Sequence, residues 1–322
     1  MWTRSLKAPT VALRPEVELL LCCARPQLDT TRADKIRALV QEPLNWPALL
    51  EIASRHGMEP LLYWHLNATC PDAVPTTRME ALHWAFHTTA LYNHFCTEEL
   101  LTLLHLLDGH GLPALSYKGP TLAVGVYGDL ALRTFSDLDL LVHERDFSRA
   151  THLLLAQGFR LHHALDWESC FIHDTPPLTV DLHRGITSHQ FHFPLDFGRL
   201  WTHRQSVSLA GAPVSTLAPE DLLLVLCVQA ARDAWGGLHK PLEHRYGRLL
   251  QSCDIAALLQ VHPDMDWGRV LADAQRMGGQ RMLFFGLRVV RELLGTALPE
   301  AVRHQGQAHP VIGVLAVHVR AQ

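Results

Sequence analysis

Apolar residues recur every three to five positions along the first third of the chain, which is the spacing of one helix face. The longest such stretch is residues 76–110, where Leu82, Phe86, Leu100 and Leu103 follow the repeat. Residues 1–110 are therefore expected to form an N-terminal helical region. Shorter helices in it are predicted at residues 15–23, 30–40, 46–56 and 60–66, several of them preceded by a residue that favours a helix start.

The pattern changes after Gly111, where short apolar runs alternate with turn residues and amphipathic stretches. Short apolar runs bounded by turns are typical of strands. We expect strands at residues 112–117, 138–143, 159–163, 169–173 and 178–183, and helices at about 121–127 and 144–157. The order β-α-β-α-β-β-β predicts an α+β fold in which residues 111–217 form a core with a mixed β-sheet.

The last third of the chain reads as helical again. A hairpin around Gly211-Ala212 is expected to end the core, at residues 206–216. Residues 218–322 are then predicted to form a C-terminal helical region, with helical patterns over residues 219–233, 246–261 and 266–294.

Neither a membrane span nor an export signal is expected. The most apolar run, residues 222–231, is about half the length that a membrane span requires. Arg4 and Lys7 near the N-terminus are not followed by the apolar segment of a signal peptide. These features favour a cytoplasmic protein without a membrane partner.

Composition narrows the class of protein further. Of the 322 residues, 48% are hydrophobic and 19% are charged, which excludes an intrinsically disordered chain. The formal net charge of -4 does not indicate a long nucleic-acid footprint. The seven cysteines include no C-x-x-C pair and are expected to be reduced thiols. The 22 histidines are scattered and predict no histidine metal site.

Candidate chemistry begins with two acids in an apolar strand, Asp137 and Asp139. Residues two apart in a strand project from the same face. Two adjacent carboxylates repel each other and favour a bound cation. Mg²⁺ prefers oxygen ligands, typically one or two carboxylates together with substrate phosphates. D-x-D alone is weak evidence, because the pair also occurs at solvated strand ends.

A third acid, Asp181, lies in the apolar strand predicted at residues 178–183. On a neighbouring strand its carboxylate would complete a site for two metal ions. There it would bind the ion that lowers the pKa of an acceptor hydroxyl, or accept the hydroxyl proton itself.

An upstream turn strengthens this interpretation. Lys118-Gly119-Pro120 stands between a predicted strand and a predicted helix, 18 residues before Asp137. Glycine lets a phosphate approach the backbone, the helix start offers N–H groups, and Lys118 adds a cation. An ordinary turn is the alternative for Gly119 taken alone.

These segments together resemble the bacterial uncharacterised nucleotidyltransferase family, which belongs to the DNA polymerase β-like nucleotidyltransferase superfamily. The resemblance covers roughly residues 15–300 and is most specific at 117–142 and 180–183. It rests on Tyr117-Lys118-Gly119, Tyr127-Gly128-Asp129, Leu132-Arg133, Ser136 to Val142, Val180 to His183, Leu217 to Leu223 and Cys253 to Ala256.

The resemblance implies a polymerase-β-like core, flanked by helical regions, that transfers a nucleoside monophosphate from an NTP to a hydroxyl and releases pyrophosphate. ATP is the expected NTP. By position, Asp137 and Asp139 would bind two Mg²⁺ ions, with Mn²⁺ as a substitute, and Asp181 would bind the catalytic one. Gly119 would lie under the triphosphate.

One departure from the superfamily pattern concerns the turn. Many members have Gly-Ser there, whereas Pro120 follows Gly119 and offers neither a hydroxyl nor an N–H. Lys118 would compensate electrostatically. Arg133 is interpreted either as a second phosphate contact or as a surface arginine near a turn. Ser136 completes the candidate nucleotide-binding residues.

The acceptor stays open, because the acids do not say which hydroxyl receives the nucleotide. It could belong to a small molecule, a peptide or protein, or an RNA end. A toxin-like enzyme acting on tRNA would need a basic groove, to which Arg133, Arg145, Arg149, Arg184, Arg199 and Arg204 could contribute. A non-catalytic nucleotide-binding or scaffold protein is the remaining alternative. Candidates to line an acceptor pocket are Trp167, His183, Arg184, Trp201, Trp235 and His239, with core packing as the alternative for each tryptophan.

Overall fold

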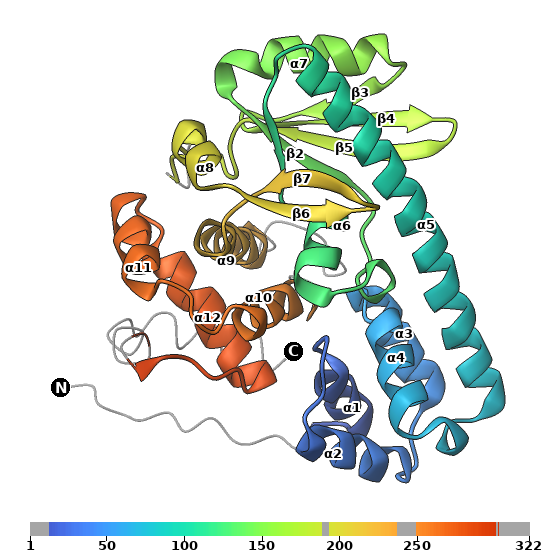
Figure 1. Ribbon diagram of the computed structural model, residues 1–322. Helices are drawn as coiled ribbons and strands as arrows, with labels where there is room; N and C mark the ends of the chain where they lie inside the picture. Colours follow the sequence, from blue (N-terminus) through green and yellow to red (C-terminus); the bar gives the residue numbers. More distant parts are fainter. Residues whose placement is uncertain (1–12, 189–192, 237–248, 301, 303–322) are drawn as a thin grey trace.

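The computed structural model describes residues 13–188, 193–236, 249–300 and 302, and Figure 1 shows their arrangement. One mixed β-sheet lies at one end of the molecule, and most of the N-terminal and C-terminal helices gather at the other. The long helix α5 (Thr76–Gly109) runs along the side and joins the two ends. The predicted α+β architecture is confirmed. Within the described residues, no helix is long and apolar enough to cross a bilayer.

The sheet has five strands in the order β1-β2-β5-β4-β3. β2 and β5 are parallel, whereas each other neighbouring pair is antiparallel. A separate hairpin pairs the two strands β6 and β7. The strands are β1 (Ala114–Ser116), β2 (Leu138–Val142), β3 (Arg160–Ala164), β4 (Glu168–Asp174), β5 (Pro177–His183), β6 (Gln205–Leu209) and β7 (Ala212–Thr216).

Alternation along β2 assigns its side chains to two different cores. Leu138, Leu140 and Val142 belong to a rear core between the sheet, α5 and α7 (Glu144–Ala156). Leu141, from the opposite face, belongs to a front core shared with the N-terminal and C-terminal helices. A central strand that is buried on both faces usually consists almost entirely of apolar residues. Asp139 lies in the middle of such a strand, and a buried carboxylate is unfavourable unless polar or charged groups contact it.

Three of the N-terminal helices begin and end where the sequence predicts, whereas the helix predicted at residues 60–66 runs from Glu59 to Thr69. Asp29 accepts a hydrogen bond from the backbone N–H of Arg32, and Asn45 accepts one from that of Ala48. Gly57 ends its helix with φ of 71°. The helices are α1 (Pro15–Cys23), α2 (Thr30–Val40), α3 (Trp46–His56) and α4 (Glu59–Thr69), with short 3₁₀ turns at Pro71–Ala73 and, after β1, Leu130–Leu132.

The C-terminal helices differ from the sequence prediction in one respect. Residues 266–294 contain two helices, because Gly278 takes φ of 72° and ends the first of them. The helices are α9 (Pro219–Gly236), α10 (Leu249–Val261), α11 (Trp267–Arg276) and α12 (Gln280–Leu294). Residues 246–248 of the predicted helix before Val261 lie outside the described residues. The division of the chain at residues 110 and 217 stays a prediction.

Two further differences concern short elements. The turn of the β6–β7 hairpin falls on Ala210 and Gly211, both at positive φ, which suits a two-residue hairpin loop. The pattern did not predict α8 (Phe197–His203), which is only seven residues long. Its start signal was present, since Asp196 accepts a hydrogen bond from the backbone N–H of Arg199.

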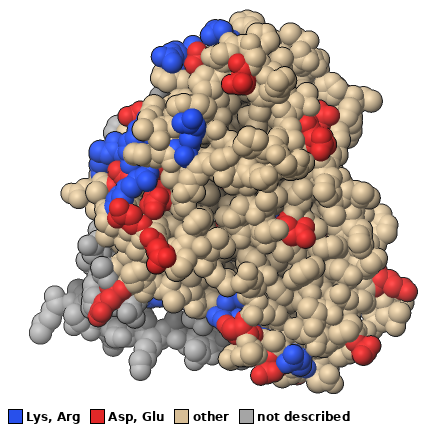
Figure 2. All heavy atoms as spheres, in the orientation of Figure 1, with Lys and Arg blue, Asp and Glu red and all other residues tan. Residues whose placement is uncertain are grey.

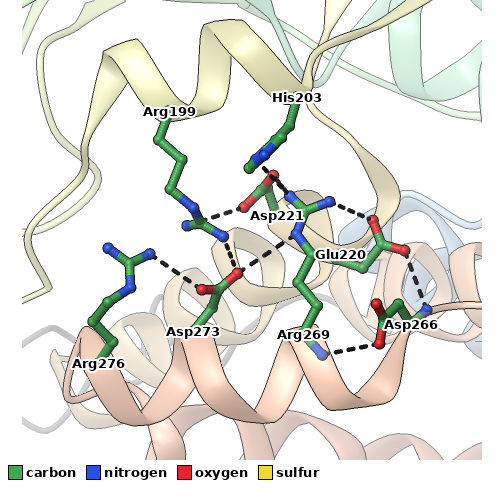
Figure 3. A network of polar contacts seen from close by, with 8 residues as sticks. All are labelled: Arg199, His203, Glu220, Asp221, Asp266, Arg269, Asp273 and Arg276. Carbon is green, nitrogen blue, oxygen red and sulfur yellow. Dashed lines mark hydrogen bonds and ion pairs between the residues drawn. The ribbon is translucent and has the colours of Figure 1, made fainter.

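Helix α8 is held to the C-terminal helices by a network of charged side chains, which Figure 3 shows. Arg199 of α8 pairs with Asp273 of α11, and its Nη1 lies 3.7 Å from Asp221 of α9. Arg269 of α11 pairs with Asp221 as well. Asp221 is buried. Its carboxylate therefore links α9 to both α8 and α11 in the interior of the protein.

Candidate active site

The three predicted acids lie together at the front of two adjacent strands. Asp139 of β2 and Asp181 of β5 are register partners in a parallel ladder, so their side chains leave the sheet on the same side. Asp137 lies in the bend directly before β2, close enough that the charges of Asp139 and Asp181 act on its carboxyl group. The rear face beside them carries Leu138 and Val180, both buried in the rear core. The predicted juxtaposition therefore occurs.

The polar surface continues onto β4, where register places Cys170 opposite Asp181 and Glu168 opposite His183. His183 follows Asp181 by two residues and faces the same side. Burial, and then the charge of Asp181, raise the pKa of the Cys170 thiol to about 12, so it stays protonated at neutral pH. Across β2, β5 and β4, one row of side chains thus contains Asp139, Asp181 and Cys170, and the adjacent row contains His183 and Glu168.

Among the described residues, Asp139 has the most side-chain contacts of the three acids, and these lie at Oδ1. The hydroxyl of Tyr117 donates to it at 3.3 Å, and Nε2 of His183 lies 3.1 Å from it. Nζ of Lys118 lies 3.6 Å from the same oxygen. Gln229 of α9 supports this arrangement, since its Nε2 donates to the Tyr117 hydroxyl at 3.4 Å.

The electrostatics differ among the three acids. Burial, and then the negative charge of Asp139, raise the pKa of Asp137 to about 6 and raise the pKa of Asp181 as well. Burial also acts upward on Asp139, but Lys118 and His183 outweigh it and hold the pKa of Asp139 below its usual range. Asp139 is therefore ionised at neutral pH, whereas its two neighbours carry an electrostatic penalty that a cation would relieve.

We expect Asp137 to make the metal-free protein less stable as pH rises from about 4 to about 6. A carboxyl whose pKa is raised on folding from 3.8 to about 6 binds its proton more tightly in the folded state, so stability is lost through that window. Urea unfolding in EDTA across this range should show the decline in the wild type and a shallower one in Asp137→Asn. Equal pH slopes in the two proteins would contradict the shifted pKa.

The Lys118-Gly119-Pro120 turn lies beside these acids. Gly119 has φ of 54° and ψ of -129°, a conformation that side chains with a Cβ rarely adopt. It precedes α6 (Pro120–Leu122), which continues into a π-helical turn, η2 (Ala123–Tyr127). A Cβ on Gly119 would lie 3.5 Å from the carbonyl oxygen of Asp137, so the turn packs directly against the acid segment.

Gly119→Ala is expected to destabilise the protein by roughly 1–3 kcal/mol, because alanine at this positive φ is strained. The space around the position is sufficient, so the loss reflects backbone conformation. Comparing urea midpoints with those of Gly128→Ala, at φ of 79° and ψ of -6° with nothing near its Cβ, gives a control in the ordinary left-handed region. A larger loss is expected for Gly119→Ala, because ψ of -129° takes Gly119 outside that region. Equal losses in the two variants would contradict a special backbone conformation at Gly119.

The other two predicted nucleotide contacts are placed differently. Ser136 is exposed, directly before the acid pair, and its carbonyl oxygen accepts a hydrogen bond from Tyr92. Arg133 is buried, so its interpretation as a surface arginine is wrong. Its Nε and Nη2 each donate to Asp254 of α10 at 2.8 Å. Its predicted role in phosphate binding stays a prediction, without support from this ion pair.

Sequence reasoning missed three residues of the site, Tyr117, Glu168 and Gln229, and assigned His183 only to an acceptor pocket. Tyr117 was visible as the residue before Lys118, but its contact with Asp139 follows from the pairing of β1 with β2. Of the other pocket candidates, Trp201 stacks on Phe197, whereas His239 and the side chain of Trp235 lie outside the described residues.

The three acids fit a divalent cation chemically. They supply the oxygen ligands that Mg²⁺ prefers. Oδ1 of Asp181 is buried without a hydrogen-bond partner, which is unfavourable unless another group satisfies it. As the side chains lie, no three His, Cys, Asp or Glu residues in the described ranges are arranged to hold a metal ion. The three acids are thus neighbours, but their side chains do not have the geometry of a complete metal-binding site.

Comparison with known proteins gives distant structural similarities and one match to a family. The antibiotic-resistance factor ANT(2'')-Ia is 13% identical with a TM-score of 0.39, over 58% of this chain and 92% of that one. An antigenic nucleotidyltransferase-like protein from Paracoccidioides brasiliensis is 14% identical with a TM-score of 0.36, over 68% and 96%. Neither similarity is strong enough to support an argument, and no curated protein matches significantly. The model of the family described as "Uncharacterised nucleotidyltransferase" matches residues 42–295, most of the chain, and the protein therefore belongs to that family.

Proposed function

We propose that this protein transfers a nucleoside monophosphate from an NTP, with ATP as the expected donor, to an acceptor hydroxyl and releases pyrophosphate. The observation that carries the proposal is the register of Asp139 with Asp181, which brings both together on one face of two parallel strands, with Asp137 directly before the first of them. Family membership supports nucleotidyl transfer as the reaction class.

Each acid has a distinct role in this proposal. Asp137 and Asp139 would hold Mg²⁺ or Mn²⁺ together with the triphosphate, and Asp181 would hold the ion nearest the acceptor or accept the acceptor's proton. When bound, the ions would neutralise phosphate charge and lower the pKa of the attacking hydroxyl. Lys118, 23% exposed at its side chain and beside Asp139, can reach a phosphate as well as the carboxylate. Arg133 is paired with Asp254 and would stabilise the segment that precedes the acid pair, without contacting the nucleotide.

The tRNA alternative is weakened because four of its six candidate arginines pair with acids, Arg133 with Asp254 among them. Arg145 and Arg149 each lie within 3.7 Å of Asp146, and Arg199 pairs with acids of α9 and α11. On the face drawn in Figure 2, Lys and Arg lie among Asp and Glu and do not form a continuous basic stripe. We therefore favour an acceptor that does not need a basic groove.

The test uses two labels in parallel. The full chain is incubated with Mg²⁺ or Mn²⁺, cell extract and each NTP labelled either at the α- or at the γ-phosphate, and protein, RNA and small-molecule fractions are separated. The proposal expects α-label in one fraction and γ-label only in pyrophosphate. The double variant Asp137→Ala/Asp139→Ala is the control. Transfer of γ-label to an acceptor, or α-label transfer that survives the double substitution, would overturn the proposal.

A further inference from the structure

The contacts of Asp139 fall on one side of its carboxylate. Tyr117, His183 and Lys118 all approach Oδ1, at 3.3, 3.1 and 3.6 Å. Among the described residues, no hydrogen bond is found to Oδ2. The described residues thus contact Oδ1 of the Asp139 carboxylate, and Oδ2 is available for a ligand such as a metal ion.

Within the described ranges, His183 is the one of the three side chains at Oδ1 that also approaches a second carboxylate. It is 2% exposed and lies between two carboxylates on neighbouring strands. Its Nε2 is hydrogen-bonded to Asp139, whereas its Nδ1 lies 3.3 Å from Oε2 of Glu168, an ion-pair distance without hydrogen-bond geometry. Register makes Glu168 and His183 directly opposed residues of β4 and β5, so the strand pairing brings the two side chains together. Turning the ring would lose the hydrogen bond from Nε2 to Asp139.

The direction of the Nε2 contact follows from the chemistry of Asp139. An ionised carboxylate only accepts hydrogen bonds, so Nε2 is the donor. A buried anion with donors at one oxygen has a defined rotation about its Cβ–Cγ bond. Orientation of a ligating carboxylate by such hydrogen bonds commonly changes metal affinity or activity by about 10- to 100-fold.

We propose that His183, oriented by Glu168, is a positioning residue that holds Oδ1 of Asp139 so that Oδ2 faces the divalent cation. This inference rests on the proposed function, because it takes Asp139 as a metal ligand. Tyr117, directly after β1, donates to the same oxygen, and its hydroxyl also accepts a hydrogen bond from Gln229. The Glu168–His183 pair links the same oxygen to β4.

Two substitutions separate the donor of His183 from its bulk. The ring also packs edge-on against Tyr117, with centroids 5.7 Å apart, so a purely structural role is the competing explanation. His183→Phe keeps an aromatic ring of similar size and removes the donor. His183→Gln removes the ring and keeps an amide N–H that can reach Asp139. A positioning role predicts rescue by glutamine, whereas a packing role predicts rescue by phenylalanine.

The experiment is a Mn²⁺ titration of the full chain without nucleotide, followed by the electron paramagnetic resonance signal of free Mn²⁺. His183→Phe is expected to weaken Mn²⁺ binding by about 10- to 100-fold, and His183→Gln by less than about threefold. Urea unfolding establishes that each variant is folded. Unchanged affinity in folded His183→Phe, or a loss in His183→Gln that equals it, would overturn the inference.

Two further variants keep the test decisive. If His183→Phe does not fold, Glu168→Leu, at a side chain 14% exposed, should still weaken Mn²⁺ binding measurably, and Glu168→Gln should weaken it less. Wild-type affinity in Glu168→Leu would then overturn the inference. Asp139→Asn tests the underlying function separately. If Asp139→Asn binds Mn²⁺ as the wild type does, the proposed metal site fails. If it loses binding while His183→Phe keeps it, only the positioning role fails.

Discussion

Replacing Asp181 with asparagine is expected to reduce nucleotide transfer by about a thousandfold, roughly 4 kcal/mol of transition-state stabilisation, and to raise the stability of the protein. The loss of activity follows from the proposed role of Asp181, because an uncharged amide is a poor metal ligand and accepts no proton. The measurements are the rate of α-label transfer and the urea midpoint in EDTA.

The gain in stability follows from the sign of the pKa shift. Burial, and then the charge of Asp139, raise the pKa of Asp181 in the folded protein. A carboxyl with a raised folded pKa is destabilising once it ionises, so its penalty is fully present above that pKa. Asparagine removes the charge at nearly the same volume. The stabilisation should therefore be present at pH 7, shrink as the pH falls from the folded pKa toward the unfolded one, and be absent below the unfolded pKa.

Asp174→Asn is the matched control for both effects. Asp174 lies on β4 of the same sheet, but it is exposed and pairs with Arg160 at the surface. It should alter neither activity nor the urea midpoint appreciably. Transfer at the wild-type rate in Asp181→Asn would remove this acid from the mechanism. A fall in its stability would contradict the electrostatic penalty that the buried carboxylate carries.

Local patterns were sufficient to predict most elements and the acids themselves. D-x-D in an apolar strand fixes the relation between Asp137 and Asp139 within three residues, and capping residues fix the ends of α2 and α3. The pairing of β2 with β5 could not be predicted in the same way. It brings Asp139 beside Asp181 across 42 positions, and the strands β3 and β4 that intervene in sequence lie on the far side of β5.

The ion pair of Arg133 with Asp254 could not be predicted from the local sequence. A basic residue four positions before Asp137 is compatible with phosphate binding, and nothing local indicates another role. Its partner, Asp254, is 121 residues away on α10, so only the packing of the C-terminal helices onto the core determines the contact. The same holds for Gln229, which reaches Tyr117 from α9. Residues that support a site from other elements leave no mark in the local sequence pattern.

Asp254→Ala is expected to lower the free energy of unfolding by about 3–5 kcal/mol, because it would leave the guanidinium of Arg133 buried without its anion. Arg133 and Asp254 are both nearly inaccessible, and the Tyr127 hydroxyl also donates to Asp254, at 2.7 Å. Two buried polar side chains of the core, Arg133 and Tyr127, thus depend on one carboxylate of α10. Urea unfolding of the single variants and of Arg133→Met/Asp254→Leu measures the effect.

The double variant should be less destabilised than Asp254→Ala, since it removes both charges and fills the space with apolar atoms. The exposed pair Arg160–Asp174 provides the comparison, because it has the same two-bond geometry, with both distances at 2.9 Å. Breaking it should leave the urea midpoint nearly unchanged. If Asp254→Ala behaves like Asp174→Ala, burial does not determine the strength of the Arg133 pair. A large loss in Asp254→Ala alone would show that burial determines how much the Arg133 pair contributes to stability.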